Sequence, residues 1–165
     1  MRQGHTPPRS CASRAFTLVE VLIVVVILGI LAAVVTPVFG NASESARQTA
    51  FVSNLRVFAD GIEVYHARTG SWPPDGSSGV LEPSLRPYLR EQEFEGGTPI
   101  GGVWDNETND TGGYAQAVGV HFNGSGETRN DAYMAQVDAI IDDGDVEAGR
   151  FGRIASGRYY LVIAD

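Results

Sequence analysis

The sequence contains no lysine and only one cysteine. All twelve basic residues are arginine, and twenty aspartates and glutamates outnumber them, which gives a formal net charge of −8. Because an acidic chain is repelled by a phosphate backbone, nucleic acid is not an expected partner. The single cysteine, Cys11, lies near the N-terminus, so no disulfide within the chain is available to stabilise its fold.

Side chains suited to catalysis are also few. Of the three histidines, His5 lies in the N-terminal tail, His66 lies in a helical pattern and His121 falls within an expected strand. No serine occupies a nucleophile elbow or lies beside an evident base. The sequence therefore does not predict an enzyme.

A long apolar run lies near the N-terminus. Val21–Val35 contains no polar side chain, and at about 1.5 Å per residue the run Phe16–Phe39 spans the roughly 30 Å of a bilayer core. It includes one carboxylate, Glu20, and follows a tail with three arginines and no acid. We interpret the run as a membrane helix. An ordinary secretory signal cut near Ala32 or Ala33 is the alternative, but it leaves Glu20 unexplained.

The start of the run has a recognisable order of residues. Ala15 is followed by FTLVE with Glu20 in fifth place, Gly29 lies inside the apolar run and Pro37 lies near its end. Together these features resemble the prepilin signal of type IV pilins and type II secretion pseudopilins, which mostly have glycine where Ala15 stands. The resemblance implies that a membrane prepilin peptidase cleaves between Ala15 and Phe16 and methylates the new amine. It also implies that the cleaved subunits stack into a fibre through their helices.

The resemblance further implies a domain organisation and a location. Residues 1–15 would be a cytoplasmic leader, residues 16–39 a transmembrane and assembly helix, and residues 40–165 a periplasmic, pilin-like globular domain. The chain would cross the bacterial inner membrane once, with its C-terminal domain in the periplasm or in an extracytoplasmic fibre. Expected partners are homologous subunits, the prepilin peptidase and the inner-membrane assembly machinery.

The residues expected to serve assembly are Phe16, Glu20, Gly29 and Pro37. A lone carboxylate in lipid should become protonated or pair with a cation. The positively charged amine of Phe16, in the same or a neighbouring subunit, is the obvious candidate, and the resemblance implies the same role for Glu20. The alternative is a boundary carboxylate that reaches headgroup water.

A second helical pattern follows Pro37. Its apolar residues recur at spacings of 4, 3, 4 and 3, as on one side of an amphipathic helix: Phe51, Leu55, Phe58, Ile62 and Tyr65. The pattern predicts one long helix from about Phe16 to about Thr69, loosened at Pro37 and ended by Gly70.

The rest of the chain predicts a small sheet. Strand patterns occur at Val103–Trp104 and Tyr114–Asn123, separated by a polar turn, and Phe151–Ile154 with Arg158–Ala164 forms a hairpin pattern. Short helices are expected near residues 81–89 and at Asp131–Ile141. The expected fold is α+β and pilin-like: a long N-terminal helix, half membrane and half amphipathic, packed on a three- or four-stranded antiparallel sheet.

An acidic turn follows the second short helix. It contains four carboxylates around Gly144, namely Asp142, Asp143, Asp145 and Glu147. Calcium prefers several oxygen ligands on a flexible loop, and some pseudopilins bind calcium in C-terminal loops. The spacing is not that of an EF-hand, and a solvated acidic turn is the alternative. No other cofactor is expected.

The sequence leaves two hypotheses about function. The first is a structural subunit of a pseudopilus or type IV pilus-like fibre in protein secretion. TPIGGVWD and VDAIIDDGD, which resemble segments of pseudopilin-like proteins, favour it. The second is a membrane-anchored periplasmic domain that binds a partner and never polymerises. Glu20 and the Ala15–Phe16 junction distinguish them, because an anchored monomer needs neither.

Overall fold

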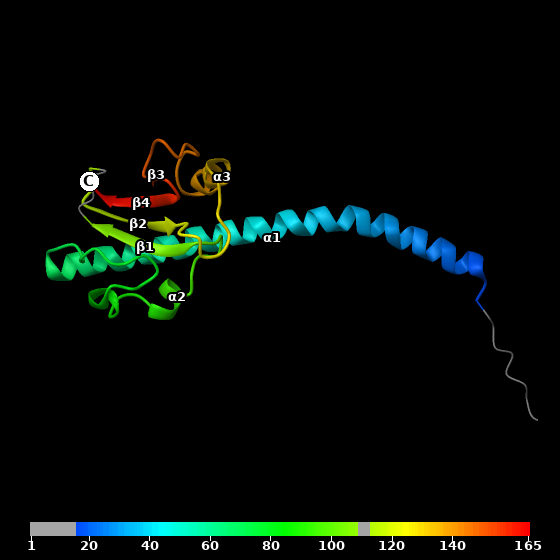
Figure 1. The fold of residues 1–165 in the computed structure, drawn as a ribbon, viewed down its shortest axis with the longest axis horizontal. Coiled ribbons are helices and arrows are strands. Elements are labelled where there is room, and N and C mark those ends of the chain that lie inside the picture. Colours follow the sequence, from blue (N-terminus) through cyan, green and yellow to red (C-terminus); the bar gives the residue numbers. More distant parts are fainter. Residues whose placement is uncertain (1–15, 109–112) are drawn as a thin grey trace, which may run out of the picture. The chain divides into compact units, whose positions relative to one another are not determined.

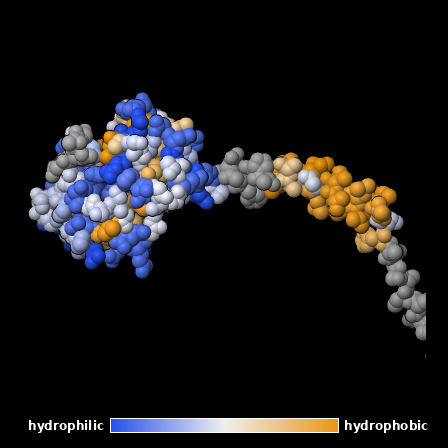
Figure 2. All heavy atoms as spheres, viewed as in Figure 1, coloured by the Kyte–Doolittle hydropathy of each residue, from blue (hydrophilic) through white to orange (hydrophobic). Residues whose placement is uncertain are grey.

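The computed structural model of the chain describes residues 16–108 and 113–165, without the side chains of residues 36–41 (Figure 1). It divides into two units, residues 1–42 and residues 43–165. The described surface of the first unit consists largely of hydrophobic residues, whereas that of the second is mostly hydrophilic (Figure 2). Each unit is treated separately below.

Helix α1, Leu18–Thr69, is assigned as one helix, as the sequence predicted. It ends at Gly70, whose φ of +75° is a backbone conformation that favours glycine, and the Gly70 amide donates to the His66 carbonyl at 2.8 Å. In the second unit, the predicted apolar stripe is buried: Phe51, Leu55, Phe58 and Ile62 are each at most 1% exposed.

The predicted antiparallel sheet has four strands in the order β1-β2-β4-β3. They are β1 Val103–Thr108, β2 Gln116–His121, β3 Phe151–Ala155 and β4 Arg158–Ala164. Strands β3 and β4 form the predicted hairpin around Ser156 and Gly157. Helix α3, Asp131–Ile141, has the predicted bounds, and the Asn130 side chain caps it by accepting from the Tyr133 amide.

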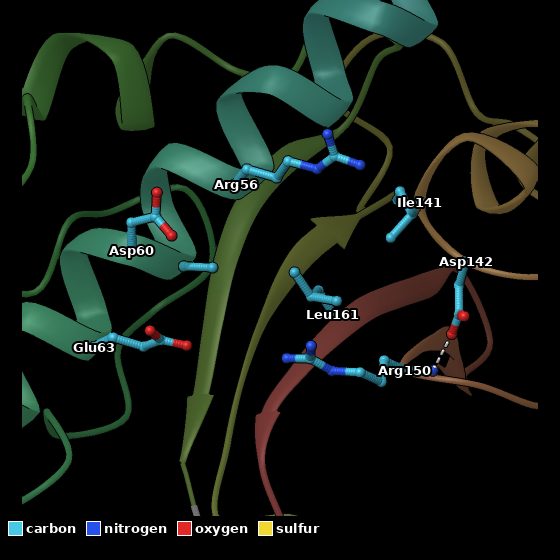
Figure 3. Close-up of a pocket in the computed structure, with 8 residues that line it drawn as sticks. Arg56, Asp60, Glu63, Ile141, Asp142, Arg150 and Leu161 are labelled. Carbon is cyan, nitrogen blue, oxygen red and sulfur yellow. Dashed lines mark hydrogen bonds between the residues drawn. The ribbon is translucent and has the colours of Figure 1, made fainter.

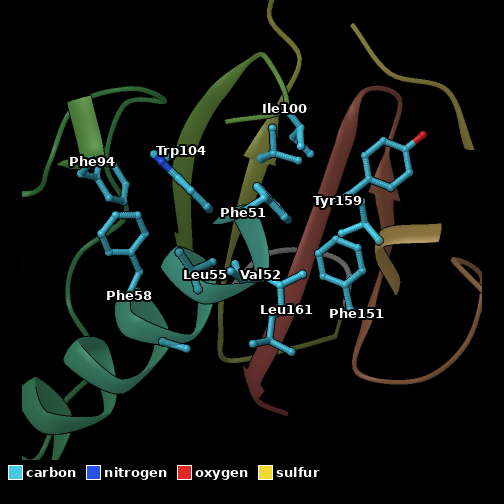
Figure 4. Close-up of a cluster of buried hydrophobic side chains, with 14 of the residues drawn as sticks. Phe51, Val52, Leu55, Phe58, Phe94, Ile100, Trp104, Phe151, Tyr159 and Leu161 are labelled. Atoms are coloured by element: carbon cyan, nitrogen blue, oxygen red, sulfur yellow. The ribbon is translucent and has the colours of Figure 1, made fainter. Parts of the chain in front are cut away.

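Aromatic rings join α1 to one face of the sheet (Figure 4). The fully buried Trp104 of β1 stacks on Phe51 with ring centroids 4.9 Å apart, and Phe58 meets Trp104 edge to face at 4.8 Å. Phe151 of β3 meets Phe51 edge to face, with ring centroids 6.4 Å apart. Such pairs add about 0.5–1.5 kcal/mol each beyond the burial of apolar area. The amphipathic half of α1 and the sheet therefore share one core.

Two expectations were wrong in detail. Strand β1 continues to Thr108, through residues expected in the polar turn, because its polar side chains find partners within the fold. The helix expected near residues 81–89 is only the 3-10 turn η1, Pro83–Leu85, and a short helix that was not predicted follows, α2, Glu91–Glu95. Pro87 limits the first, as the sequence indicated.

Loops cover both edges of the sheet. The Gly79 amide donates to the Trp104 carbonyl of β1 at 2.7 Å, and the Arg153 amide of β3 donates to the Val146 carbonyl at 2.7 Å. Backbone groups that would pair with another chain are thus occupied at these points.

Candidate processing and assembly site

The expected processing site lies just before α1. Ala15 is outside the described residues, whereas Phe16 is described and 82% exposed. Leu18–Val35 is long and apolar enough to cross a membrane, and none of it is buried against the described rest of the chain. A helix of this kind needs lipid or other helices around it.

Thr17 and Glu20 form a capping box at the start of α1. The Glu20 amide donates to Thr17 Oγ1 at 3.2 Å, and the Thr17 amide donates to Glu20 Oε2 at 2.9 Å. The Thr17 hydroxyl also donates to Glu20 Oε2 at 2.9 Å. Two backbone donors that a helix start leaves unpaired are satisfied reciprocally. The threonine three residues before Glu20 is the signal that sequence reasoning missed.

The capping box uses one of the two carboxylate oxygens of Glu20. Within residues 16–108 and 113–165, Oε1 accepts no hydrogen bond, whereas Oε2 accepts two. Because the carboxylate projects from an exposed part of the helix, Oε1 is open to a donor from outside the chain. Capping its own helix and pairing with an external amine are therefore compatible.

The other two residues expected to serve assembly are Gly29, whose surroundings the structure describes, and Pro37, for which it gives only the helix assignment. Apart from its chain neighbours and the nearby backbone of its own helix, no atom lies within 4 Å of where a Cβ on Gly29 would stand, so this position is open on the helix surface. The helix assignment runs through Pro37, but its side chain lies outside the described residues.

Three of the four carboxylates of the acidic turn accept from backbone amides of their own loop, and the fourth pairs with an arginine of β3. Asp143 accepts from the Asp145 amide at 2.9 Å, Asp145 accepts from the Glu147 amide at 3.1 Å, and Asp142 accepts from the Arg150 amide. Glu147 pairs with the Arg153 guanidinium. In the described ranges, no three histidine, cysteine, aspartate or glutamate side chains converge to hold a metal ion. Calcium binding by this turn stays an untested hypothesis.

Asp138 is a buried carboxyl that the sequence did not single out. It lies in α3 with 0% exposure, and neither of its oxygens has a hydrogen-bond partner in the described structure. Burial raises its pKa to about 6; the Gly144 amide opposes the rise, and the charges of Asp143 and Asp142 add to it. An aspartate among apolar helix positions was the available signal.

The face of the sheet opposite α1 holds a second polar cluster. Asp105 of β1 is 2% exposed, and its Oδ2 accepts from the Ser78 hydroxyl at 2.6 Å and the Tyr160 hydroxyl at 2.7 Å. Gly119 leaves room for this, because a Cβ there would lie 2.8 Å from the Tyr160 ring. Ser78 also contacts His121 Nδ1 at 2.9 Å.

This cluster contains serine, histidine and aspartate but is not a nucleophilic triad. In a triad the imidazole bridges hydroxyl and carboxylate through its two nitrogens. Here the Ser78 hydroxyl is the bridge, and His121 Nδ1 lies 4.0 Å from Asp105. Burial, followed by the charge of Arg158, lowers the pKa of His121 despite the nearby Asp105. The Ser78 hydroxyl therefore occupies Nδ1 of the His121 ring.

Known proteins are similar to this chain in sequence. Residues 11–36 match the family model described as the prokaryotic N-terminal methylation motif. The chain is 33% identical over 91 residues to the type IV major pilin protein PilE of Neisseria gonorrhoeae, covering 51% of this chain and 52% of that protein. It is 35% identical over 88 residues to type II secretion system core protein G of Klebsiella pneumoniae, covering 51% and 61%.

A solved structure has the same fold. The major type IV pilin PilA1 from Clostridium difficile aligns over 76% of this chain and 98% of its own length, with a TM-score of 0.53 and 19% sequence identity. The chain spans about half the length of the curated pilins that it matches. These findings confirm the predicted resemblance and the pilin-like α+β fold.

Proposed function

We propose that this type IV pilin-like chain is a structural subunit of a pseudopilus-like fibre that serves protein secretion, cleaved before Phe16 and methylated there. The observation that carries the proposal is the methylation motif at residues 11–36, placed on an apolar helix that has no cover within the described chain. The relatives named type II secretion core protein G support secretion as the setting.

The exposed helix supports assembly through other subunits. Lipid covers Leu18–Val35 while the subunit is in the inner membrane, and helices of neighbouring subunits replace that lipid in a fibre. The open surface at Gly29 allows another helix to approach closely.

Glu20 supports a charge pairing at the docking step. The amine of a neighbouring Phe16 carries a positive charge, and an unpaired ion in an apolar bundle costs several kcal/mol. The free Oε1 of Glu20 offers that amine a partner, while Oε2 keeps the start of the helix capped.

The processing step is tested by the mass of the protein purified from its native membrane. We expect a chain that begins at Phe16 and carries one added methyl group. An uncut chain would contradict the proposal and favour a membrane-anchored periplasmic domain that does not polymerise. A chain beginning beyond Ala33 would instead indicate an ordinary secretory signal.

The charge pairing is tested with Glu20→Ala and Glu20→Gln. Glutamine still closes a capping box but carries no charge, so it separates the two roles. We expect both variants to insert in the membrane at normal levels and to release at least about tenfold fewer fibres on shearing. Normal fibre release by Glu20→Gln would show that only the cap is needed.

A further inference from the structure

A groove on the globular unit is lined by charges of both signs. It holds about 350 Å³ and lies between α1 on one side and the end of α3 with the loop before β3 on the other (Figure 3). Two arginines line it, Arg56 of α1 and Arg150 just before β3. Two carboxylates of α1 line it as well, Asp60 and Glu63. Its volume is that of a small-molecule site, since such sites hold roughly 300–1,000 Å³.

The four charged groups of this groove do not neutralise one another. Within the described residues, none of Arg56, Arg150, Asp60 and Glu63 forms an ion pair, although Arg56 and Asp60 are four residues apart on α1. A guanidinium N-terminal to a carboxylate is the weaker arrangement of such a helical pair. Six other arginines of the described structure do pair with carboxylates: Arg47, Arg86, Arg90, Arg129, Arg153 and Arg158. The groove therefore concentrates charges that the fold leaves unpaired.

Backbone groups hold both guanidinium groups in position. Arg56 donates to the Ile140 carbonyl of α3 and Arg150 donates to the Val162 carbonyl of β4, each at 3.3 Å. The backbone of Arg150 is fixed as well, because its amide donates to Asp142 and its carbonyl accepts from the Val162 amide at 2.8 Å. A guanidinium has more N–H donors than the one used in each of these bonds. Both arginines thus keep donors for a ligand.

The floor of the groove is apolar. Ala59 of α1 is 7% exposed and Leu161 of β4 is 9% exposed, and Ile141 at the end of α3 is partly buried. In Figure 3, Leu161 lies between the charged side chains of α1 and those near β3. An aliphatic group that lay on these side chains would lose apolar surface to water, which favours binding.

We propose that this groove binds a free α-amino acid with an aliphatic side chain. Arg56 and Arg150 bind the carboxylate of the ligand through charge-assisted hydrogen bonds. Asp60 and Glu63 bind its ammonium group, and its side chain lies on the apolar floor. The end of a peptide offers only one of these two charges, so it leaves the other pair of groove charges unneutralised. The site goes beyond the proposed fibre function and does not depend on it.

Equilibrium dialysis of the full chain in detergent, with radiolabelled leucine as the probe, tests the proposal. N-acetyl-leucine lacks the ammonium charge and leucine amide lacks the carboxylate charge, while both keep the side chain. We expect leucine to bind, and each of the two analogues to compete at least about tenfold more weakly than unlabelled leucine. An absence of binding at millimolar leucine would overturn the proposal. Equal competition by either analogue would also overturn it, because the end of a peptide would then fit as well.

Two neutral variants of the groove test the assignment of its residues. One carries Arg56→Gln with Arg150→Gln, and the other carries Asp60→Asn with Glu63→Gln, so each removes one sign of charge. All four side chains are exposed, so the melting temperature is expected to stay close to that of the unmodified chain. The affinity for leucine is expected to fall at least about tenfold in each variant. Unchanged affinity in either variant would overturn the proposal.

The matched control removes one charge of each sign outside this groove. It carries Arg68→Gln with Glu82→Gln, neither of which lines the groove. We expect the control to bind leucine as the unmodified chain does. A loss of affinity equal to that of the groove variants would show that the net charge of the chain, and not this groove, governs binding, and it would overturn the proposal.

Discussion

Replacing Asp138 with asparagine is expected to stabilise the globular unit at neutral pH and to change it little in acid. The side chain is fully buried in α3, and neither oxygen has a hydrogen-bond partner in the described structure. Its pKa is raised to about 6, chiefly by burial and secondarily by the neighbouring carboxylates. The folded protein thus retains a proton that the unfolded chain releases near pH 4.

The direction of the effect follows from this difference in proton binding. Asp138 contributes stability that is fully present below its unfolded pKa of 3.8 and is lost as the pH rises through about 6. The difference corresponds to roughly 3 kcal/mol at about 1.4 kcal/mol per pKa unit. Water around the exposed loop beside the carboxyl screens part of it, which leaves an effect of about 1–2 kcal/mol.

Asparagine has nearly the same shape and no charge, so it removes the cost of ionisation. Thermal unfolding of residues 43–165 measures the change between pH 4 and pH 8. We expect Asp138→Asn to raise Tm by about 4–8 °C at pH 7.5 and by less than about 1 °C at pH 4. Asp60→Asn is the control, since Asp60 is exposed and has no partner in the described chain. An Asp138→Asn effect that does not vary with pH would refute the reasoning.

Three further predictions concern the globular unit. A Cβ at Gly119 would lie 2.1 Å from the Tyr159 carbonyl oxygen, so Gly119→Ala should lower the free energy of unfolding, measured in urea, by about 3 kcal/mol; an unchanged midpoint would contradict this. Phe51→Ala removes a fully buried ring that stacks on Trp104, and should cost about 3–5 kcal/mol in the same assay; a loss below about 1 kcal/mol would contradict the described core. Millimolar calcium should leave Tm unchanged, because the acidic turn binds its own loop; a rise in Tm that a chelator reverses would establish a metal site there.

The sequence predicted those parts of the fold that depend on apolar periodicity. The stripe from Phe51 to Ile62 is buried as its spacing indicated, and the C-terminal hairpin has the expected turn. The predicted strand at Val103–Trp104 was shorter than β1 because the second half of β1 is polar. Asp105 is accommodated in the strand because Tyr160, 55 positions later, and Ser78, 27 positions earlier, both donate to it. A contact between residues so far apart in the chain leaves no local pattern in the sequence.

The candidate site was predictable in part for a similar reason. Glu20 stands out because it is the lone charge in an apolar run. Its partner Thr17 is a residue type common at helix starts and does not stand out in the sequence. The reverse held for the acidic turn. Four adjacent carboxylates draw attention in the sequence, whereas in the structure amides and Arg153 occupy them, and the unusual carboxyl is the solitary Asp138.

The capping box also explains how α1 can begin so close to the proposed cleavage site, the Ala15–Phe16 bond. Both partners of the box, Thr17 and Glu20, lie after the Ala15–Phe16 bond, so the proposed cleavage would leave the box intact. The amine that this proposed cleavage would create lies one residue before the cap, at the end of the helix where the dipole is positive. That end disfavours a cation and favours the Glu20 carboxylate. A positive amine at Phe16 is therefore better placed beside the free oxygen of a glutamate on a neighbouring helix than at the end of its own.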